Sequence, residues 1–166
     1  GTKGKSTTLE LIRVMLAAHR ARPALLSSAH RIIADAVRAN PYGNSMPGRG
    51  RMQRFLRAAR DAEATHVLLE VTSEGCAQHR HRFIDWDVAA FTNLSPEHVE
   101  SHGSFEAYRE AKLSFFRSLG QSRKRLRRFV VNADDLNAGH FEDAASAVAD
   151  HQLIPFRVSK LPRALT

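Results

Sequence analysis

The chain begins Gly1-Thr2-Lys3-Gly4-Lys5-Ser6-Thr7, and the residues that follow place leucine and isoleucine at helical spacing. Glycines allow successive backbone N–H groups to point at one anion, while a lysine reaches the outer phosphates of a nucleotide and a hydroxyl binds magnesium. A helix that starts at such a loop adds the positive end of its dipole. The stretch therefore predicts a phosphate-binding loop, although Gly-Lys-Ser alone also occurs in unrelated surface loops.

The full phosphate-loop pattern, G-x-x-x-x-G-K-[ST], starts with a glycine that follows a strand. Here the first residue falls inside the pattern, so we expect a fragment that lacks the first strand of its fold. The 166 residues, 43% hydrophobic and 25% charged, suit one globular domain. The single cysteine excludes an intrachain disulfide, no apolar run reaches the length of a membrane span, and the polar first residues do not resemble a signal peptide, although a truncated start would hide one. We expect a cytoplasmic protein without a membrane partner.

The formal charge of +8 would suit a polyanionic partner. Much of it lies in two clusters, which are Arg49, Arg51, Arg54, Arg57 and Arg60, and then Arg117, Arg123, Lys124, Arg125, Arg127 and Arg128. The second cluster has no interleaved aromatic residue for base stacking, and the first contains a single one, Phe55. We therefore favour solvated surfaces over a nucleic-acid partner.

The first half of the chain predicts a helix over 6–19, a short strand over 24–28 and a second helix over 51–61. The second helix places Met52, Phe55, Leu56 and Ala59 on one face. Residues 31–38 are interpreted as helical or irregular. Residues 40–50 form a loop by their Gly, Pro and Asn content.

The second half contains three short apolar runs, 66–71, 88–93 and 129–132, that do not alternate with polar residues. They predict buried parallel strands. Ser104 can cap a helix that extends through Leu119, and a helix over 138–149 precedes a strand over 153–156. Alternating helices and strands predict an α/β fold, a mostly parallel open sheet flanked by helices, of the P-loop NTPase type.

Ligands of such sheets bind at the carboxyl ends of the strands. Glu70 lies at one strand end, inside Leu-Leu-Glu-Val, where burial of a carboxylate without a cation would be costly. This position favours a magnesium ligand over a solvated acid.

The most specific pattern lies in residues 87–116, where T-N-L at 92–94 is followed by H-x-x-x-H-G at 98–103 and Y-x-x-A-K at 108–112. This segment resembles the central domain of the Mur ligases, and among them the UDP-N-acetylmuramoyl-tripeptide synthetases. Residues 1–7 resemble the family's G-T-N-G-K-T-T, 70–73 its E-V-S-S, 78–80 its Q-H-R and 132–135 its N-A-D-D. Residues 44–48 resemble its N-T-T segment only loosely. Departures from the family's pattern are Lys3, Glu74, Glu97 and Glu100, of which the last two keep a carboxylate.

The resemblance implies an ATP-dependent ligase that adds an amino acid to UDP-N-acetylmuramoyl-dipeptide through an acyl phosphate, in peptidoglycan synthesis. The N-terminal UDP-binding and C-terminal amino-acid-binding domains of the family are absent from the sequence, so we expect part of a longer chain. Alternatives are another Mur-like ligase, such as a folylpolyglutamate or cyanophycin synthetase, or a non-catalytic P-loop module that binds nucleic acid. A monomer is expected.

The resemblance also implies site residues. Those for ATP are Gly1, Thr2, Lys3, Gly4, Lys5, Ser6, Thr7, Asn93, Asn132 and Asp135. Those for two magnesium ions are Ser6, Glu70, His98 and a carbamylated Lys112. The catalytic candidates are Lys5, Glu70, His98 and Lys112. Those for the muramoyl-peptide substrate are Asn44, Ser45, Ser73, Gln78 and Arg80. From the residues alone, an exposed loop histidine is the favoured interpretation of His98 and a solvated basic run that of Arg80. The alternative for Lys112 is a surface lysine that pairs with Glu106 or Glu110.

Overall fold

A computed structural model of the chain describes residues 2–96 and 99–159. The chain forms two compact units, one of Gly4–His81 and one in which Gly1–Lys3 joins Arg82–Thr166. Each unit is an α/β structure built on its own sheet. None of the helices in the described part is both long and apolar enough to span a membrane.

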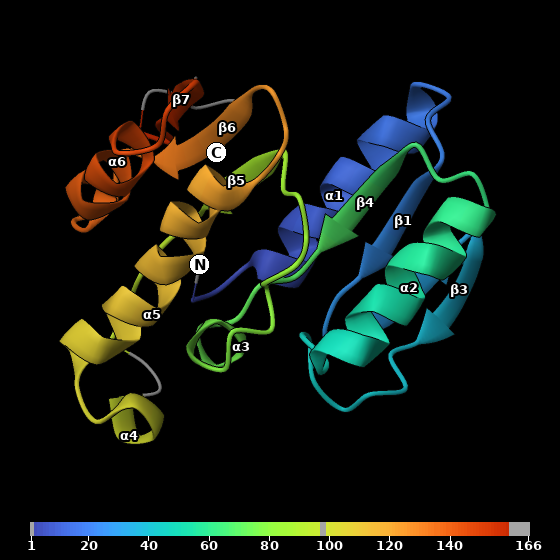
Figure 1. Ribbon diagram of the computed structural model, residues 1–166, viewed down its shortest axis with the longest axis horizontal. Helices are drawn as coiled ribbons and strands as arrows, with labels where there is room; N and C mark the ends of the chain where they lie inside the picture. The colour runs from blue at the N-terminus through green and yellow to red at the C-terminus, as the bar shows by residue number, and fades with distance from the viewer. Residues whose placement is uncertain (1, 97–98, 160–166) are drawn as a thin grey trace. The chain divides into compact units, whose positions relative to one another are not determined.

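The Gly4–His81 unit contains a four-stranded sheet in the order β3-β2-β1-β4 (Figure 1). Its strands are β1 (Pro23–Leu26), β2 (His30–Ile33), β3 (Ala36–Ala39) and β4 (His66–Leu69). β1 is parallel to β4, and β2 is antiparallel to both β1 and β3. The helices are α1 (Lys5–Ala18), α2 (Arg49–Asp61) and the short α3 (Ser73–Ala77). Ala24, Leu25 and Leu26 of β1 are fully buried, so this strand forms the centre of the core.

The sequence correctly predicts α2 and most of its buried face. Met52, Phe55 and Ala59 are buried at helical spacing, while the arginines between them point outward. The prediction for residues 31–38, in contrast, is wrong, because they form the β2–β3 hairpin. Ala34 and Asp35 both have positive φ angles, 49° and 63°, as a two-residue hairpin turn requires. Neither is glycine, so the usual sequence signal for such a turn is missing.

The loop before α2 packs against α3. The side chain of Thr72 caps α3 by accepting a hydrogen bond from the Gly75 N–H at 3.1 Å. A Cβ atom at Gly75 would lie 2.4 Å from Sδ of Met46 and 3.1 Å from its Cβ. Met46 is only 1% exposed and has little room to move. Position 75 therefore requires glycine because of this close approach.

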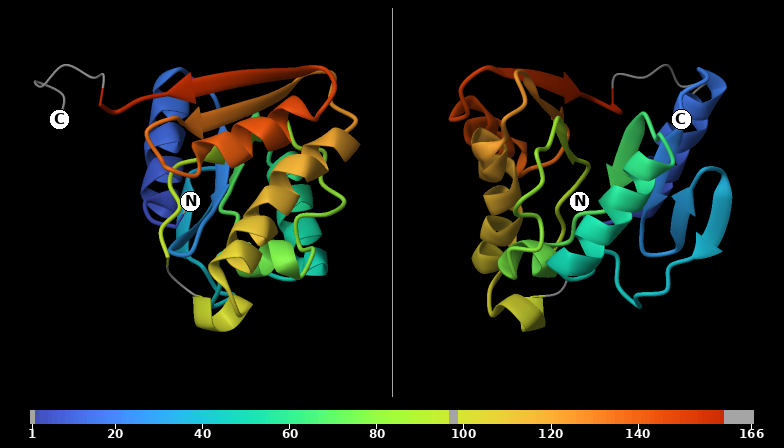
Figure 2. Two further views of the ribbon diagram at one scale, coloured as in Figure 1. Left: turned by 90° about the vertical axis from the view of Figure 1, so that its left-hand side faces the viewer. Right: turned by 45° about the vertical axis from the view of Figure 1, so that its right-hand side comes forward.

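The other unit contains a three-stranded parallel sheet in the order β5-β6-β7, with β6 and β7 side by side in both views of Figure 2. The strands are β5 (Val88–Phe91), β6 (Arg127–Asn132) and β7 (His151–Phe156). The helices are α4 (Val99–His102), α5 (Phe105–Ser118), the 3-10 turn η1 (Leu119–Gln121) and α6 (Ala138–Ser146). As predicted, Ser104 caps α5, with its hydroxyl accepting from the Ala107 N–H at 3.0 Å.

Aromatic residues from α5 and α6 cover one face of this sheet. Phe91 stacks on Phe141 at 3.8 Å between ring centroids, and Phe116 packs edge-on against Phe141 at 5.0 Å. The opposite face is more open, and Val88 is 45% exposed. The prediction of strands buried on both faces is therefore wrong for β5 and β6, which alternate between covered and more exposed positions. It is also wrong for β4, in which none of the four residues is buried. An apolar run in the sequence does not by itself show whether one or both faces of the resulting strand are covered by other elements.

Ion pairs connect Arg123 and Lys124 of the second basic cluster to the segment before β5. Arg123 contacts Asp85 at 2.7 Å, and Lys124 contacts Asp87 at 3.4 Å. The Ser122 hydroxyl donates to the carbonyl of Trp86 at 2.9 Å. Hydrogen bonds from the side chain and the backbone of Arg123 hold the pKa of Asp85 below its usual value. These basic residues thus connect a helix to a strand and remain largely solvated, as the sequence indicates.

We predict that Gly75→Ala lowers the free energy of unfolding by about 1–3 kcal/mol, because the new methyl group overpacks the site against Met46. Gly50→Ala on α2 is the matched control, since a Cβ atom there meets open space and alanine favours a helix by about 0.5–1 kcal/mol. Urea denaturation of both variants measures the difference. Equal stability of Gly75→Ala and the wild type would contradict the packing of Met46 described above.

Asp85→Asn should lower the melting temperature at neutral pH, because it removes the carboxylate that accepts from Arg123. A lowered folded-state pKa stabilises the protein above the unfolded-state pKa, and this stabilisation is lost as the pH falls through the folded-state pKa. The difference between variant and wild type should therefore shrink in acid. Asp143→Asn, at an exposed position on α6, is the control. Calorimetric melting temperatures across the acidic range measure both, and a difference that is independent of pH would exclude the ion pair as the cause.

Candidate functional site

Four polar side chains meet where α1 begins. The carboxylate of Glu70 is 4% exposed and accepts hydrogen bonds from the Ser6 hydroxyl at 2.6 Å and from the Ser28 N–H at 2.9 Å. The Ser6 and Ser28 hydroxyls lie 2.9 Å apart, and Lys5 Nζ lies 3.9 Å from the other oxygen of Glu70. We call Lys5, Ser6, Ser28 and Glu70 the α1 cluster. It joins three of the residues predicted from the sequence.

The sheet explains why these residues meet. β1 and β4 run parallel with Leu26 opposite Leu69, so the residues that follow both strands lie at one edge. The Glu70 N–H donates to the Leu26 carbonyl at 3.0 Å and extends this pairing by one step. Gly4, with φ of 73°, turns the chain into the first turn of α1, where Lys5 and Ser6 lie. Helix N-termini expose unpaired N–H groups to an anion.

The donor atoms of the α1 cluster suit a hard cation. Magnesium prefers oxygen ligands, keeps several waters and is usually bound by one or two carboxylates together with substrate phosphates. A buried carboxylate beside two hydroxyls fits that pattern. In the described part of the chain, no group of three or more His, Cys, Asp or Glu residues is placed to hold a metal ion. The sequence analysis missed Ser28, although its place after β1 is a usable signal.

Hydrogen bonds connect the first residues of the phosphate-loop sequence to Asn93, just after β5. The side-chain oxygen of Asn93 accepts from the N–H groups of Thr2 at 3.0 Å and Lys3 at 2.9 Å, and its amide donates to the Lys3 carbonyl at 3.0 Å. Thr2 is 7% exposed, and its hydroxyl lies 3.0 Å from that of Tyr108. Gly1 lies outside the described residues, and Thr7 is exposed on α1.

Asn132 and Asp135 shape the loop after β6. The Asn132 amide donates to the Thr92 carbonyl at 2.7 Å, and its oxygen accepts from the Asp134 N–H at 3.1 Å. Asp135 accepts from the Leu94 N–H at 2.8 Å through one oxygen and from the Asn137 N–H at 2.8 Å through the other. These side chains tie the ends of β5 and β6 together. Contact between them and a nucleotide stays a prediction.

Lys112 is 8% exposed on α5, with Nζ 4.7 Å from the centroid of the Tyr108 ring. The interpretation as a surface lysine is therefore wrong. Glu110 instead pairs with Arg117 further along the helix. His98, the predicted partner of Lys112 at a second metal, lies outside the described residues.

The predicted substrate residues gather around α3. Arg80 donates to the Met46 carbonyl at 2.6 Å and to the side-chain oxygen of Gln78. Ser73 starts α3 and is 8% exposed. Arg80 is thus fastened to the loop that carries Asn44 and Ser45, and does not belong to a solvated run. The carbonyl of Asn44 accepts from the side chain of Asn40 at 2.8 Å.

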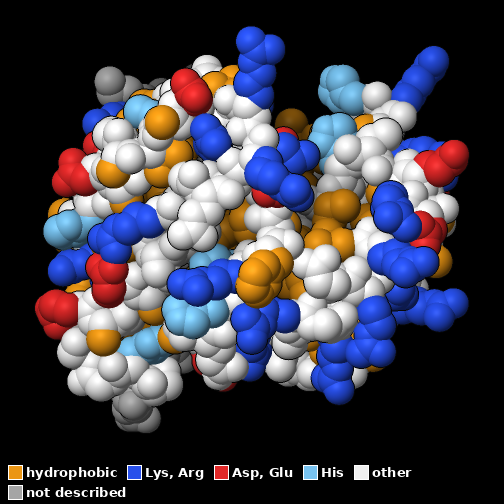
Figure 3. All heavy atoms as spheres, in the orientation of Figure 1, with side chains coloured by type: hydrophobic (Ala, Val, Ile, Leu, Met, Phe, Trp, Pro, Cys, Tyr) orange, Lys and Arg blue, Asp and Glu red, His pale blue; other side chains and the backbone are white. Residues whose placement is uncertain are grey.

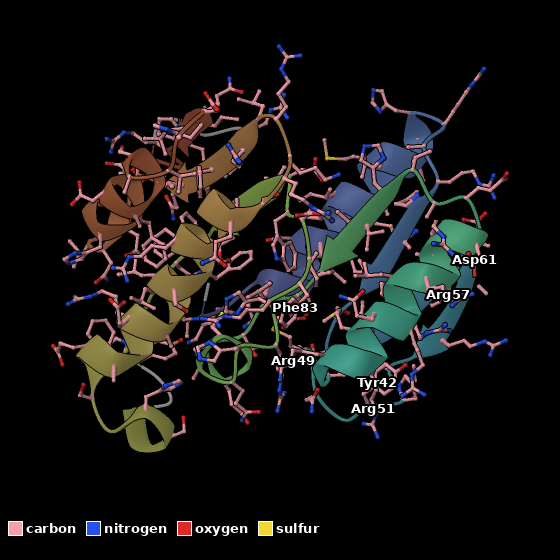
Figure 4. The ribbon with its side chains drawn as sticks, viewed as in Figure 1. Tyr42, Arg49, Arg51, Arg57, Asp61 and Phe83 are labelled. Carbon is pink, nitrogen blue, oxygen red and sulfur yellow. The ribbon has the colours of Figure 1, made fainter. Side chains whose placement is uncertain are left out.

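Arginines gather around α2 on the face shown in Figure 3. Figure 4 shows Arg51 beside Tyr42, with the guanidinium 5.4 Å from the ring centroid. Arg57 lies 3.8 Å from Asp61 in the same helix. Intramolecular contacts thus engage part of this first basic cluster.

Comparison with known proteins places these features in a family. The family model of the Mur ligase middle domain matches residues 1–159. The UDP-N-acetylmuramoyl-L-alanyl-D-glutamate–2,6-diaminopimelate ligase of Geobacillus kaustophilus is 32% identical over 149 residues, which cover 89% of this chain and 30% of the relative. The UDP-N-acetylmuramyl-tripeptide synthetase of a Roseiflexus species is 32% identical over 158 residues, with 90% and 31% covered.

A solved structure of a UDP-N-acetylmuramoyl-L-alanyl-D-glutamate–2,6-diaminopimelate ligase superimposes with a TM-score of 0.81 at 26% sequence identity. The match covers 96% of this chain and 31% of that chain. The chain thus spans about 30% of the length of these relatives. Because the family model covers nearly all of its length, the chain belongs to the Mur ligase middle-domain family.

Proposed function

We propose that this chain is the ATP-binding part of a ligase that joins a carboxylate to an amino acid. The observation that carries the proposal is the α1 cluster, in which the buried Glu70 carboxylate meets Lys5, Ser6 and Ser28 at the start of a helix. A lysine, a helix N-terminus and magnesium-compatible oxygens are what a nucleotide polyphosphate requires. The Mur ligase membership supports ATP as that nucleotide.

The roles within the α1 cluster follow from its chemistry. Ser6, Ser28 and Glu70 would hold magnesium, which supplies charge neutralisation for phosphoryl transfer. Lys5 would move from its position near Glu70 toward the outer phosphates. Asn93 would keep the backbone of Thr2 and Lys3 in place through its three hydrogen bonds. This arrangement provides orientation and electrostatic stabilisation, the main needs of phosphoryl transfer.

We further propose that the carboxylate substrate is a UDP-N-acetylmuramoyl-dipeptide. The names of the relatives, which specify ligases of such dipeptides with 2,6-diaminopimelate or synthetases of the tripeptide, support this substrate. Its carboxylate would attack the γ-phosphate of ATP and release ADP. The amine of an amino acid would then attack the acyl phosphate, lose a proton and release phosphate. Asn44, Ser45, Ser73, Gln78 and Arg80 would contact the muramoyl peptide.

Burial of Lys112 supports a modified side chain. A lysine that is 8% exposed and lies against Tyr108 has lost most of its hydration. Carbamylation by carbon dioxide would give an anionic side chain with two oxygens, which a second magnesium ion prefers over an ammonium group. His98 would complete that second site.

Lys5→Ala should weaken the binding of magnesium ATP by roughly tenfold or more, because it removes a charged hydrogen-bond donor to the phosphates. Lys124→Ala is the control, since Lys124 is exposed and pairs with Asp87. Titration calorimetry measures affinity, and circular dichroism verifies the fold. An unchanged affinity in Lys5→Ala would remove the assignment of the phosphate loop.

Carbamylation predicts that 13C-labelled bicarbonate gives the wild-type chain a carbamate carbon resonance that Lys112→Ala lacks. Lys124→Ala should retain it, because that lysine is solvated. Carbon NMR of the three proteins in the presence of magnesium measures the signal. A wild-type protein without the resonance, or a resonance that persists in Lys112→Ala, would contradict the modification.

A further inference from the structure

Helix α1 contacts the β1–β2 turn at two points. Ser6 and Glu10 lie one helical turn apart, so both side chains face the same side of α1. The Ser6 hydroxyl lies 2.9 Å from that of Ser28, and a carboxylate oxygen of Glu10 lies 2.8 Å from Nδ1 of His30. Ser6 and Glu10 of the helix thus contact Ser28 and His30 of the turn region, respectively.

The turn itself is tightly held. The His30 N–H donates to the hydroxyl of Ser27 at 3.1 Å, and the Ser27 N–H donates to the His30 carbonyl at 2.9 Å. Asn40 donates to the carbonyls of Ser27 at 2.8 Å and Ala29 at 2.9 Å. Ser27 is fully buried. A displacement of His30 would therefore move the whole turn, including the N–H and the hydroxyl of Ser28.

Glu10 is held on the helix side as well. Nε of Arg13 donates to its second carboxylate oxygen at 2.9 Å. Partial burial works to raise the pKa of Glu10, but the hydrogen bonds and charges of Arg13 and His30 together hold that pKa below its usual value. Glu10 is therefore an anion at neutral pH, and Nδ1 of His30 carries the hydrogen of their bond.

We propose that Glu10 and His30 form a latch that positions Ser28 for magnesium, with both acting as positioning residues. The inference rests on the proposed function of the α1 cluster and adds two residues to it. The latch sets the distance between α1 and the turn, so that the Ser28 N–H stays on Glu70 and the Ser28 hydroxyl stays beside Ser6. Preorganised ligands of this kind strengthen metal binding through contacts outside the metal's own ligands.

A purely structural role makes a different prediction. The side chains of His30 and Glu10 are 45% and 28% exposed, and exposed ion pairs contribute little to stability. If the pair served stability alone, its loss would lower the melting temperature and affect ATP binding equally with and without magnesium. If the pair positions Ser28, its loss affects mainly the magnesium-dependent part.

The experiment measures the affinity of this chain for ATP by calorimetry, once with magnesium and once with EDTA. We expect His30→Ala and Glu10→Ala each to weaken magnesium ATP by about fivefold, the scale of one hydrogen bond, and to leave metal-free ATP unchanged. The double variant should lose no more than either single variant. Glu10→Gln keeps an acceptor for His30 and should retain most of the affinity. Glu63→Ala, which removes the Arg22–Glu63 pair of the same unit, is the control.

Equal losses with and without magnesium, additive losses in the double variant, or no loss would overturn the latch. Exchange of the Ser28 amide hydrogen, measured by NMR without nucleotide, tests the latch independently. His30→Ala and Glu10→Ala should speed this exchange, whereas Glu63→Ala should not. If the wild-type chain binds no magnesium ATP, the proposed function fails, and faster Ser28 exchange in the latch variants would still support the positioning of the turn. Unchanged exchange in both variants would refute it.

Discussion

The buried carboxylate of Glu70 imposes the strongest constraint on this structure. A carboxylate that is 4% exposed must be compensated, because an unpaired buried charge costs several kcal/mol. Ser6, the Ser28 N–H and Lys5 provide that compensation. Ser6 and Lys5 come from the start of α1 and Ser28 from the turn after β1, so these two segments and the end of β4 must meet at one point. Two parallel strands in register make this possible.

The unit that contains β5, β6 and β7 is held together in a similar way, by hydrogen bonds from side chains to the backbone. Asn93 and Asp135 follow strands, Asn132 ends one, and all three bind backbone groups of neighbouring segments. Their engagement assigns them a structural role that the family resemblance alone does not reveal. A side chain that shapes the loops of a site is as necessary to it as one that touches the ligand, since loop backbones carry their own unpaired polar groups.

Charge in this protein is compensated locally in some places and left exposed in others. The basic connection before β6 pairs with Asp85 and Asp87, whereas the arginines of α2 have Asp61 as the one acid within their helix. The formal charge of +8 therefore combines two different surfaces. The number of charged residues in the sequence does not show which of them form ion pairs, because pairing depends on which segments meet after folding.

The sequence alone determined the α/β class, the helix that follows Gly4 and the face of α2, and it placed Glu70 inside a buried strand end, because these follow from local spacing and from the apolar residues around Glu70. Only the tertiary structure decided that residues 31–38 form a hairpin, that β5 and β6 have one well-covered face, and that Lys112 is buried against Tyr108. It also brought Ser28, in the β1–β2 turn, and His30, at the start of β2, to α1. Such features depend on partners distant in the chain, and local patterns contain no record of which segments pack together.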